Sequence, residues 1–167
     1  MGIESYFFSV EFKDILTTEE VMSVFEKKYN VLPYMTLSGN LIKHYHVWEN
    51  CYVLDNKAVI HIYEPSKITF DLCFSNFETN LIYMYGVLRN ILPMGERANL
   101  IIYNKKHSFE HLNVEEFKYL LKDANKDKFN TFKRYYGDLE FDTIPNDFYR
   151  YFRRFKIKNR IKRFFKK

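Results

Sequence analysis

The sequence predicts an α+β fold, in which a mainly antiparallel mixed sheet of about five to six strands is packed by helices and followed by a helical C-terminal region. Three observations favour this class. Strand-like runs in the middle of the chain are joined by tight turns rather than by crossover helices. Helical periodicity starts after capping-box patterns and stops at proline or glycine. Hydrophobic residues make up 47% of the 167 residues and charged residues 28%, which is a globular composition.

The N-terminal half is predicted to form a strand, a helix and a series of hairpin strands. Residues 6–12 are aromatic and β-branched and predict the first strand. Thr17 and Glu20 have the spacing of a capping box, which opens a helix that we expect Pro33 to end. Turn residues then separate further strands, which we place at 34–37, 41–48, 51–54, 58–63 and 68–74.

The C-terminal half is predicted to consist mainly of helices. Ser75 and Glu78 form a second capping-box pattern. The helix that follows carries apolar residues at helical spacing, and these should face the sheet: Phe77, Leu81, Met84, Leu88 and Ile91. A strand is placed at 99–104. A third capping-box pattern at 113–116 opens another helix, and a further helical stretch ends at Gly137.

Charge divides the chain into two parts. Ten basic residues and no acidic residue lie between Arg150 and Lys167, whereas residues 1–149 carry 16 basic and 21 acidic side chains. We therefore distinguish an α+β domain at 1–147 from a basic, aromatic C-terminal helix or tail at 148–167. The formal net charge of +5 thus conceals an acidic body.

The basic tail allows several interpretations, which the sequence leaves open. It can be a final helix with a solvated basic end, whose aromatic first half docks on the body. It can lie on an anionic membrane surface as a short interfacial helix, or contact an acidic protein. It can also bind nucleic acid through six basic residues: Arg150, Arg153, Arg154, Lys158, Arg160 and Arg163.

No residue pattern typical of catalysis or cofactor binding stands out. The sequence has no P-loop, no dinucleotide-binding fingerprint and no Gly-x-Ser-x-Gly, and it contains only five glycines. We expect no cofactor, no metal and no small-molecule substrate. A weaker alternative is a metal-dependent enzyme with ligands from adjacent strands: His44, His46, His61 and Asp71. Whether His61 shares a face with the other two histidines depends on the length of the turn at 55–57.

The cellular environment is also constrained by the sequence. A run of about 18 apolar residues and a signal-peptide pattern are both absent, so we expect a cytoplasmic protein. Cys51 and Cys73 each lie in an apolar, strand-like run and are expected to be buried thiols. The chain has 14 tyrosines, 17 phenylalanines and one tryptophan, Trp48. This aromatic content indicates either an interaction surface or the coding bias of an AT-rich genome.

The acidic body resembles small bacterial immunity proteins, which neutralise toxins delivered between competing cells. The resemblance covers the general build of residues 1–149 and an opening, Met1–Ser5, that leads straight into the strand at 6–12. It implies a protein partner, such as a toxin enzyme, whose active site or adjacent surface is blocked. Because nuclease toxins are usually basic, the candidate contacts are acidic residues and aromatic anchors: Tyr135, Tyr136, Asp138, Glu140, Phe141, Asp142 and Asp147.

Overall fold

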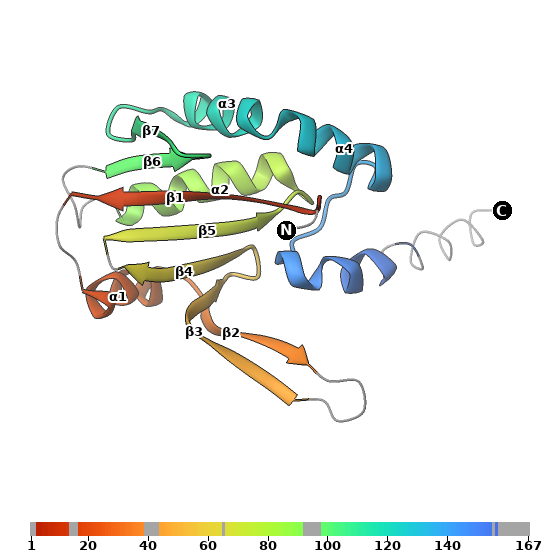
Figure 1. Ribbon diagram of the computed structural model, residues 1–167, viewed down its shortest axis with the longest axis horizontal. Helices are drawn as coiled ribbons and strands as arrows, with labels where there is room; N and C mark the ends of the chain where they lie inside the picture. The colour runs from red at the N-terminus through yellow and green to blue at the C-terminus, as the bar shows by residue number, and fades with distance from the viewer. Residues whose placement is uncertain are drawn as a thin grey trace.

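The computed structural model describes residues 3–13, 17–38, 44–64, 66–91, 98–154 and 156. Within these ranges, seven strands form one antiparallel sheet in the order β2-β3-β4-β5-β1-β6-β7 (Figure 1). The strands are β1 (Ser5–Phe12), β2 (Val31–Ser38), β3 (His44–Leu54), β4 (Ala58–Glu64), β5 (Lys67–Cys73), β6 (Ala98–Ile102) and β7 (Lys105–Ser108). The helices are α1 (Thr18–Lys28), α2 (Phe77–Ile91), α3 (Val114–Ala124), α4 (Lys126–Tyr136) and the 3-10 helix η2 (Pro145–Asp147). The α+β class predicted from the sequence is confirmed.

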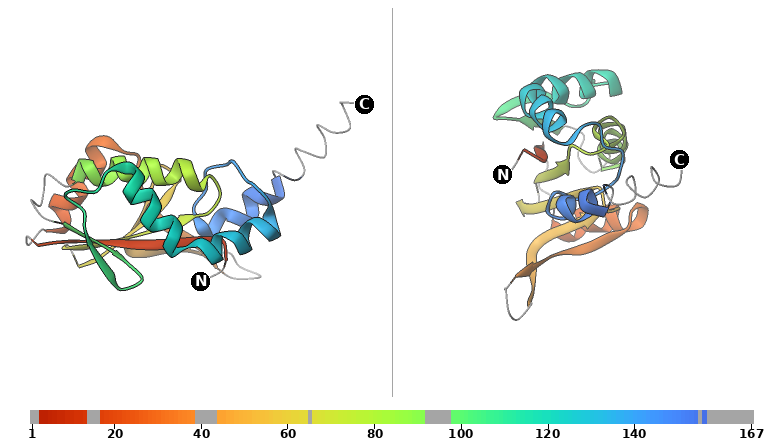
Figure 2. Two further views of the ribbon diagram at one scale, coloured as in Figure 1. Left: turned by 90° about the horizontal axis from the view of Figure 1, so that it is seen from above. Right: turned by 90° about the vertical axis from the view of Figure 1, so that its right-hand side faces the viewer.

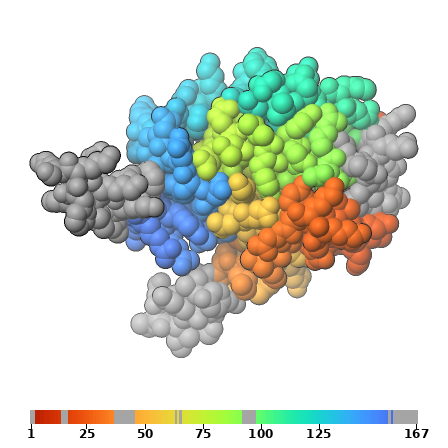
Figure 3. All heavy atoms as spheres, turned by 180° about the vertical axis from the view of Figure 1, so that it is seen from behind, coloured from red at the N-terminus to blue at the C-terminus, as the bar shows by residue number. Residues whose placement is uncertain are grey.

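The helices α1, α2 and α3 pack against one face of the sheet (Figures 1 to 3). Alternate residues of the strands point to this face, as in the pair Phe8 and Phe70, whose rings stack at 5.3 Å. Phe117 of α3 meets Phe8 edge-on at 5.8 Å. The five α2 residues predicted to face the sheet are all buried. Each such large side chain contributes roughly 1.5–3 kcal/mol of hydrophobic stabilisation.

Two of the three predicted capping boxes are present. In α1, Thr17 Oγ1 accepts from the Glu20 amide while Glu20 accepts from the Thr17 amide, and Asn113 and Glu116 do the same for α3. The third prediction is wrong, because α2 begins at Phe77 and Ser75 therefore lies one position before its N-cap. The carbonyl of the residue at that N-cap, Asn76, accepts the first helical hydrogen bond of α2.

Several strand predictions need correction. Pro33 does not end α1, which stops at Lys28, but lies inside β2. Because β2 is an edge strand, the missing proline amide costs the sheet little. The strands predicted at 41–48 and 51–54 are one strand, β3, whose pairing with β2 shifts register between Pro33 and Met35. This irregularity accommodates Asn50 at a φ of 53°.

Strand β7 was not predicted. It follows a two-residue hairpin in which Tyr103 and Asn104 have φ values of 46° and 66°. Positive φ at both central positions is the geometry of a type I′ turn, which usually contains glycine or asparagine. Of the two residues, only Asn104 is typical of such a turn, so the sequence did not indicate a hairpin here.

The segment after α4 crosses to the other face of the sheet. There Ile144 packs with Tyr34, Cys51 and Val59 in a second, small apolar cluster. Residues 148–154 are helical, and Phe148 is fully buried in the main core. The first residues of the basic segment thus pack as part of the body.

Candidate partner-binding surface

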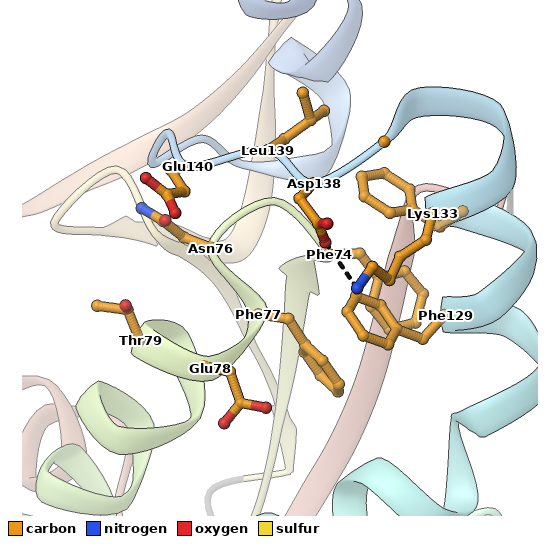
Figure 4. Close-up of a pocket in the computed structure, with 12 residues that line it drawn as sticks. Phe74, Asn76, Phe77, Glu78, Thr79, Phe129, Lys133, Asp138, Leu139 and Glu140 are labelled. Atoms are coloured by element: carbon orange, nitrogen blue, oxygen red, sulfur yellow. Dashed lines mark ion pairs between the residues drawn. The ribbon is translucent and has the colours of Figure 1, made fainter.

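A pocket of about 520 Å³ opens beside the N-terminus of α2 (Figure 4). Its walls come from α2, from α4 and from the segment that follows α4. Two of the acidic residues predicted to bind a partner, Asp138 and Glu140, lie in its lining. The pocket therefore brings together parts of the chain that are about 60 residues apart, and we treat it as the candidate site.

The floor of the pocket is aromatic. It consists of four phenylalanines: Phe74, Phe77, Phe129 and Phe132. Phe77 lies 4.5 Å from Phe129 and 5.1 Å from Phe74, measured between ring centroids. Three of the rings are buried, and Phe129 is partly buried. Close-packed rings of this kind make a rigid apolar surface whose faces carry partial negative charge.

The rim of the pocket is predominantly acidic. Three carboxylates, Glu78, Asp138 and Glu140, line it together with one cation, Lys133. Lys133 Nζ lies 2.7 Å from Asp138 Oδ1, and this is the ion pair drawn in Figure 4. Glu78 pairs with Lys122 of α3. Glu140 is exposed and forms no ion pair within the described ranges, so it is the carboxylate most available to a ligand.

Local backbone geometry fixes this arrangement. Gly137 ends α4 with φ 79° and ψ −168°, a conformation that is essentially restricted to glycine. The chain then turns back toward α2, where the Asn76 amide donates to the Leu139 carbonyl at 2.9 Å. Leu139 itself is buried. The two flanking acidic residues, Asp138 and Glu140, are consequently held on the solvent side of the segment.

The predicted aromatic contacts differ in accessibility. Tyr135 has 68% of its surface exposed. Tyr136 is partly buried, and its hydroxyl donates to Glu4 at 3.0 Å and lies 3.2 Å from the hydroxyl of Tyr149. Burial, with the hydrogen bonds to Tyr149 and Glu4, raises the pKa of Tyr136. Tyr135 is thus open to a partner, whereas the Tyr136 hydroxyl is engaged within the chain.

The other predicted contacts also make internal interactions. Asp142 accepts from Asn76 Nδ2 at 2.9 Å and pairs with Lys57 Nζ at 3.0 Å. Burial alone would raise the pKa of Asp142, but the bonds from Asn76 and Lys57 lower it below its usual value. This carboxylate therefore fastens the segment to the sheet.

Two predicted contacts lie farther along the segment. Phe141 stacks on Phe148, with ring centroids 6.1 Å apart. Asp147 is partly exposed at the end of η2, and its amide donates to the Ile144 carbonyl at 3.1 Å. Phe141 thus faces the body, whereas Asp147 can still be reached from solvent.

Half of the predicted nucleic-acid contacts fall within the structure. Arg150, Arg153 and Arg154 are exposed on the helical segment at 148–154. The remaining candidates lie outside the described residues: Lys158, Arg160 and Arg163.

The histidines proposed as metal ligands are dispersed. The His46 ring packs on Trp48 at 5.1 Å, whereas His61 Nδ1 lies 3.2 Å from Cys51 Sγ. A three-residue turn at 55–57 sets the pairing of His61 with Cys51. The side chain of His44 lies outside the described part. Among the side chains that are described, no three histidine, cysteine, aspartate or glutamate residues are placed to hold a metal ion.

Sequence reasoning missed the pocket residues on α2 and the aromatic floor. The sequence indicates a capping residue at Glu78 and a core residue at Phe77, which is the ordinary role of such residues at the start of a helix. Only the contact between α2 and the segment after α4 gives them a shared site, and no local sequence signal encodes that contact.

Comparisons with known proteins give no match, whether with protein-family models, with curated proteins or with solved structures. None of the described helices combines the length and apolar character needed to cross a lipid bilayer.

Proposed function

We propose that the chain is a non-enzymatic protein-binding domain, an immunity or inhibitor protein that blocks a toxin or another enzyme by surface complementarity. The observation that carries the proposal is the pocket with an aromatic floor and an acidic rim. Such a pocket suits an anchor side chain of a partner, because binding energy in protein interfaces concentrates in a few residues that fill well-packed pockets.

The chemistry of the pocket favours a basic anchor. The aromatic floor already attracts a cation of the chain itself, because Lys133 Nζ lies over the Phe129 ring at 5.6 Å, and a partner's guanidinium or ammonium group could take the place of Lys133 there. Glu140 would supply a charge-assisted hydrogen bond, and Glu78 lies on the same rim. Tyr135 adds an exposed aromatic surface nearby on α4. A basic partner would also be steered toward the acidic body as it approaches.

The test is a binding measurement with the partner recovered from the native host. We expect the immobilised chain to recover an enzyme whose activity it inhibits. Replacing Glu140 with lysine should weaken binding at least tenfold, about 1.4 kcal/mol, because it places a cation where the anchor would sit. Glu140 is exposed, so the variant should fold normally.

A matched control is the same charge change at Glu26, an exposed residue of α1 at the other end of the molecule from α4 (Figure 1). Glu26→Lys should leave affinity within twofold of the parent chain. If Glu26→Lys and Glu140→Lys weakened binding equally, the loss of affinity would come from the change in net charge alone. That result would refute the pocket as the binding site.

A nucleic-acid-binding accessory role is the alternative, supported by the three exposed arginines at 150, 153 and 154. It requires retention on nucleic acid that falls steeply with salt and is lost when these three arginines are replaced by glutamine. Inhibition of a protein partner through the pocket would survive those substitutions, so a single triple variant separates the two functions.

A further inference from the structure

The two edges of the sheet differ in length and in chemistry. Strand β7 has four residues and begins with Lys105 and Lys106, and lysines on a short edge strand oppose pairing with another chain. Strand β2 has eight residues and contains no charged side chain. Only β2 therefore offers a long edge without such protection.

The exposed apolar residues concentrate at the same edge. Four of the large apolar side chains with about half of their surface exposed lie on β2 and β3: Leu32, Met35, Val47 and Trp48. Met35 and Val47 are cross-strand neighbours and form one continuous apolar strip. Figure 1 shows that β2 and β3 extend away from the helices. Within the described ranges, β3 is the element that packs extensively on β2.

The absence of charge on β2 fits a second copy of the same chain. When an edge strand pairs antiparallel with its own copy about a twofold axis, residues near the axis meet themselves or a near neighbour, whereas residues at one end of the strand meet those at the other end. A charged residue near the axis would therefore lie close to the like charge of the second copy. Strand β2 brings no like charges together, and Met35 would lie within two positions of Met35 of the second copy.

We propose that β2 pairs antiparallel with β2 of a second copy, which joins two seven-stranded sheets into one continuous sheet. Pro33 has no amide hydrogen and cannot donate a hydrogen bond to the second copy. The pairing therefore runs through the backbone of residues 34–38, which follow Pro33 in β2. Met35 and Val47 of both copies then form one apolar strip across the junction. This interface is separate from the pocket and does not depend on the function proposed for it.

The test uses charge substitutions at Met35, of which 52% is exposed. The parent chain should sediment at twice its monomer mass of 20.4 kDa, over about 1–100 μM protein. Met35→Lys and Met35→Glu should each halve that mass, because two like charges meet at the junction. Mixing the two variants in equal amounts should restore the doubled mass, since opposite charges then face each other.

A control variant excludes a general effect of charge on a surface apolar residue. Ile82→Lys alters an α2 side chain with 54% exposure and should sediment like the parent chain. Amide exchange should show β2 protected in the parent chain and in the mixture, but not in either Met35 variant alone. A parent chain that stays monomeric, a Met35→Lys variant that stays dimeric, or a mixture that stays monomeric would each overturn the proposal.

Discussion

Asp71 is a carboxylate in an unfavourable environment, and its removal should stabilise the protein. It lies on β5 between Phe7 and Val59 of the neighbouring strands. Its Oδ1 atom is buried and has no hydrogen-bond partner in the part of the chain that the structure describes. Burial raises the pKa of Asp71 to about 6, although Lys128 and a hydrogen bond with Ser5 act in the opposite direction. We expect Asp71→Asn to increase stability at neutral pH.

The magnitude follows from linkage between protonation and folding. The usual pKa is 3.8, so the raised value near 6 corresponds to about 3 kcal/mol at 1.36 kcal/mol per pH unit. Because the folded-state pKa lies above the unfolded one, the folded chain binds more protons between these two values. Stability therefore falls as pH rises from about 4 to about 6, and the full penalty is present at pH 7.

The assay is urea unfolding followed by circular dichroism, at several pH values between 4 and 7.5. The Asp71→Asn variant should be up to about 3 kcal/mol more stable than the parent at pH 7, and the difference should vanish near pH 4. A variant that is less stable than the parent at pH 7, or a difference that does not change with pH, would refute the assignment of a buried, penalised charge.

Further predictions concern the backbone and the core. Gly86 lies inside α2 and Gly137 ends α4, and a Cβ atom would meet no other atom at either position. Gly86→Ala should therefore raise the unfolding free energy by about 0.5–1 kcal/mol through helix propensity alone. Gly137→Ala should lower it by about 1–3 kcal/mol, because its φ of 79° strains an alanine. Phe148→Ala should cost about 3–5 kcal/mol in the same urea assay, whereas an effect below 1 kcal/mol would mean that this segment is not part of the core.

Local patterns predicted the elements well where one physical signal was sufficient. The capping boxes at Thr17 and Asn113 and the stop at Gly137 depend on neighbouring residues only, and all three occur as predicted. Pro33 shows the limit of such signals. Proline can end a helix or occupy an edge strand, and which one applies depends on the position of β2 in the finished sheet.

The site was less accessible to sequence reasoning, because its parts come from distant segments. Asp138, Glu140 and Asp142 are equivalent in the sequence as members of one acidic segment. In the fold, Asp142 is held by Lys57 and Asn76, whereas Glu140 faces solvent. Their different roles arise from partners 60 or more positions away, and a single sequence does not specify those contacts.

The position of β1 inside the sheet has a consequence for biosynthesis. This strand leaves the ribosome before its partners β5 and β6, which begin at Lys67 and Ala98. At 5–20 residues per second, the 54 residues between the end of β1 and the start of β5 take about 3–11 s to synthesise. During that interval an aromatic strand with no partner is available to chaperones or to other nascent chains, so slower translation should reduce the yield of native protein.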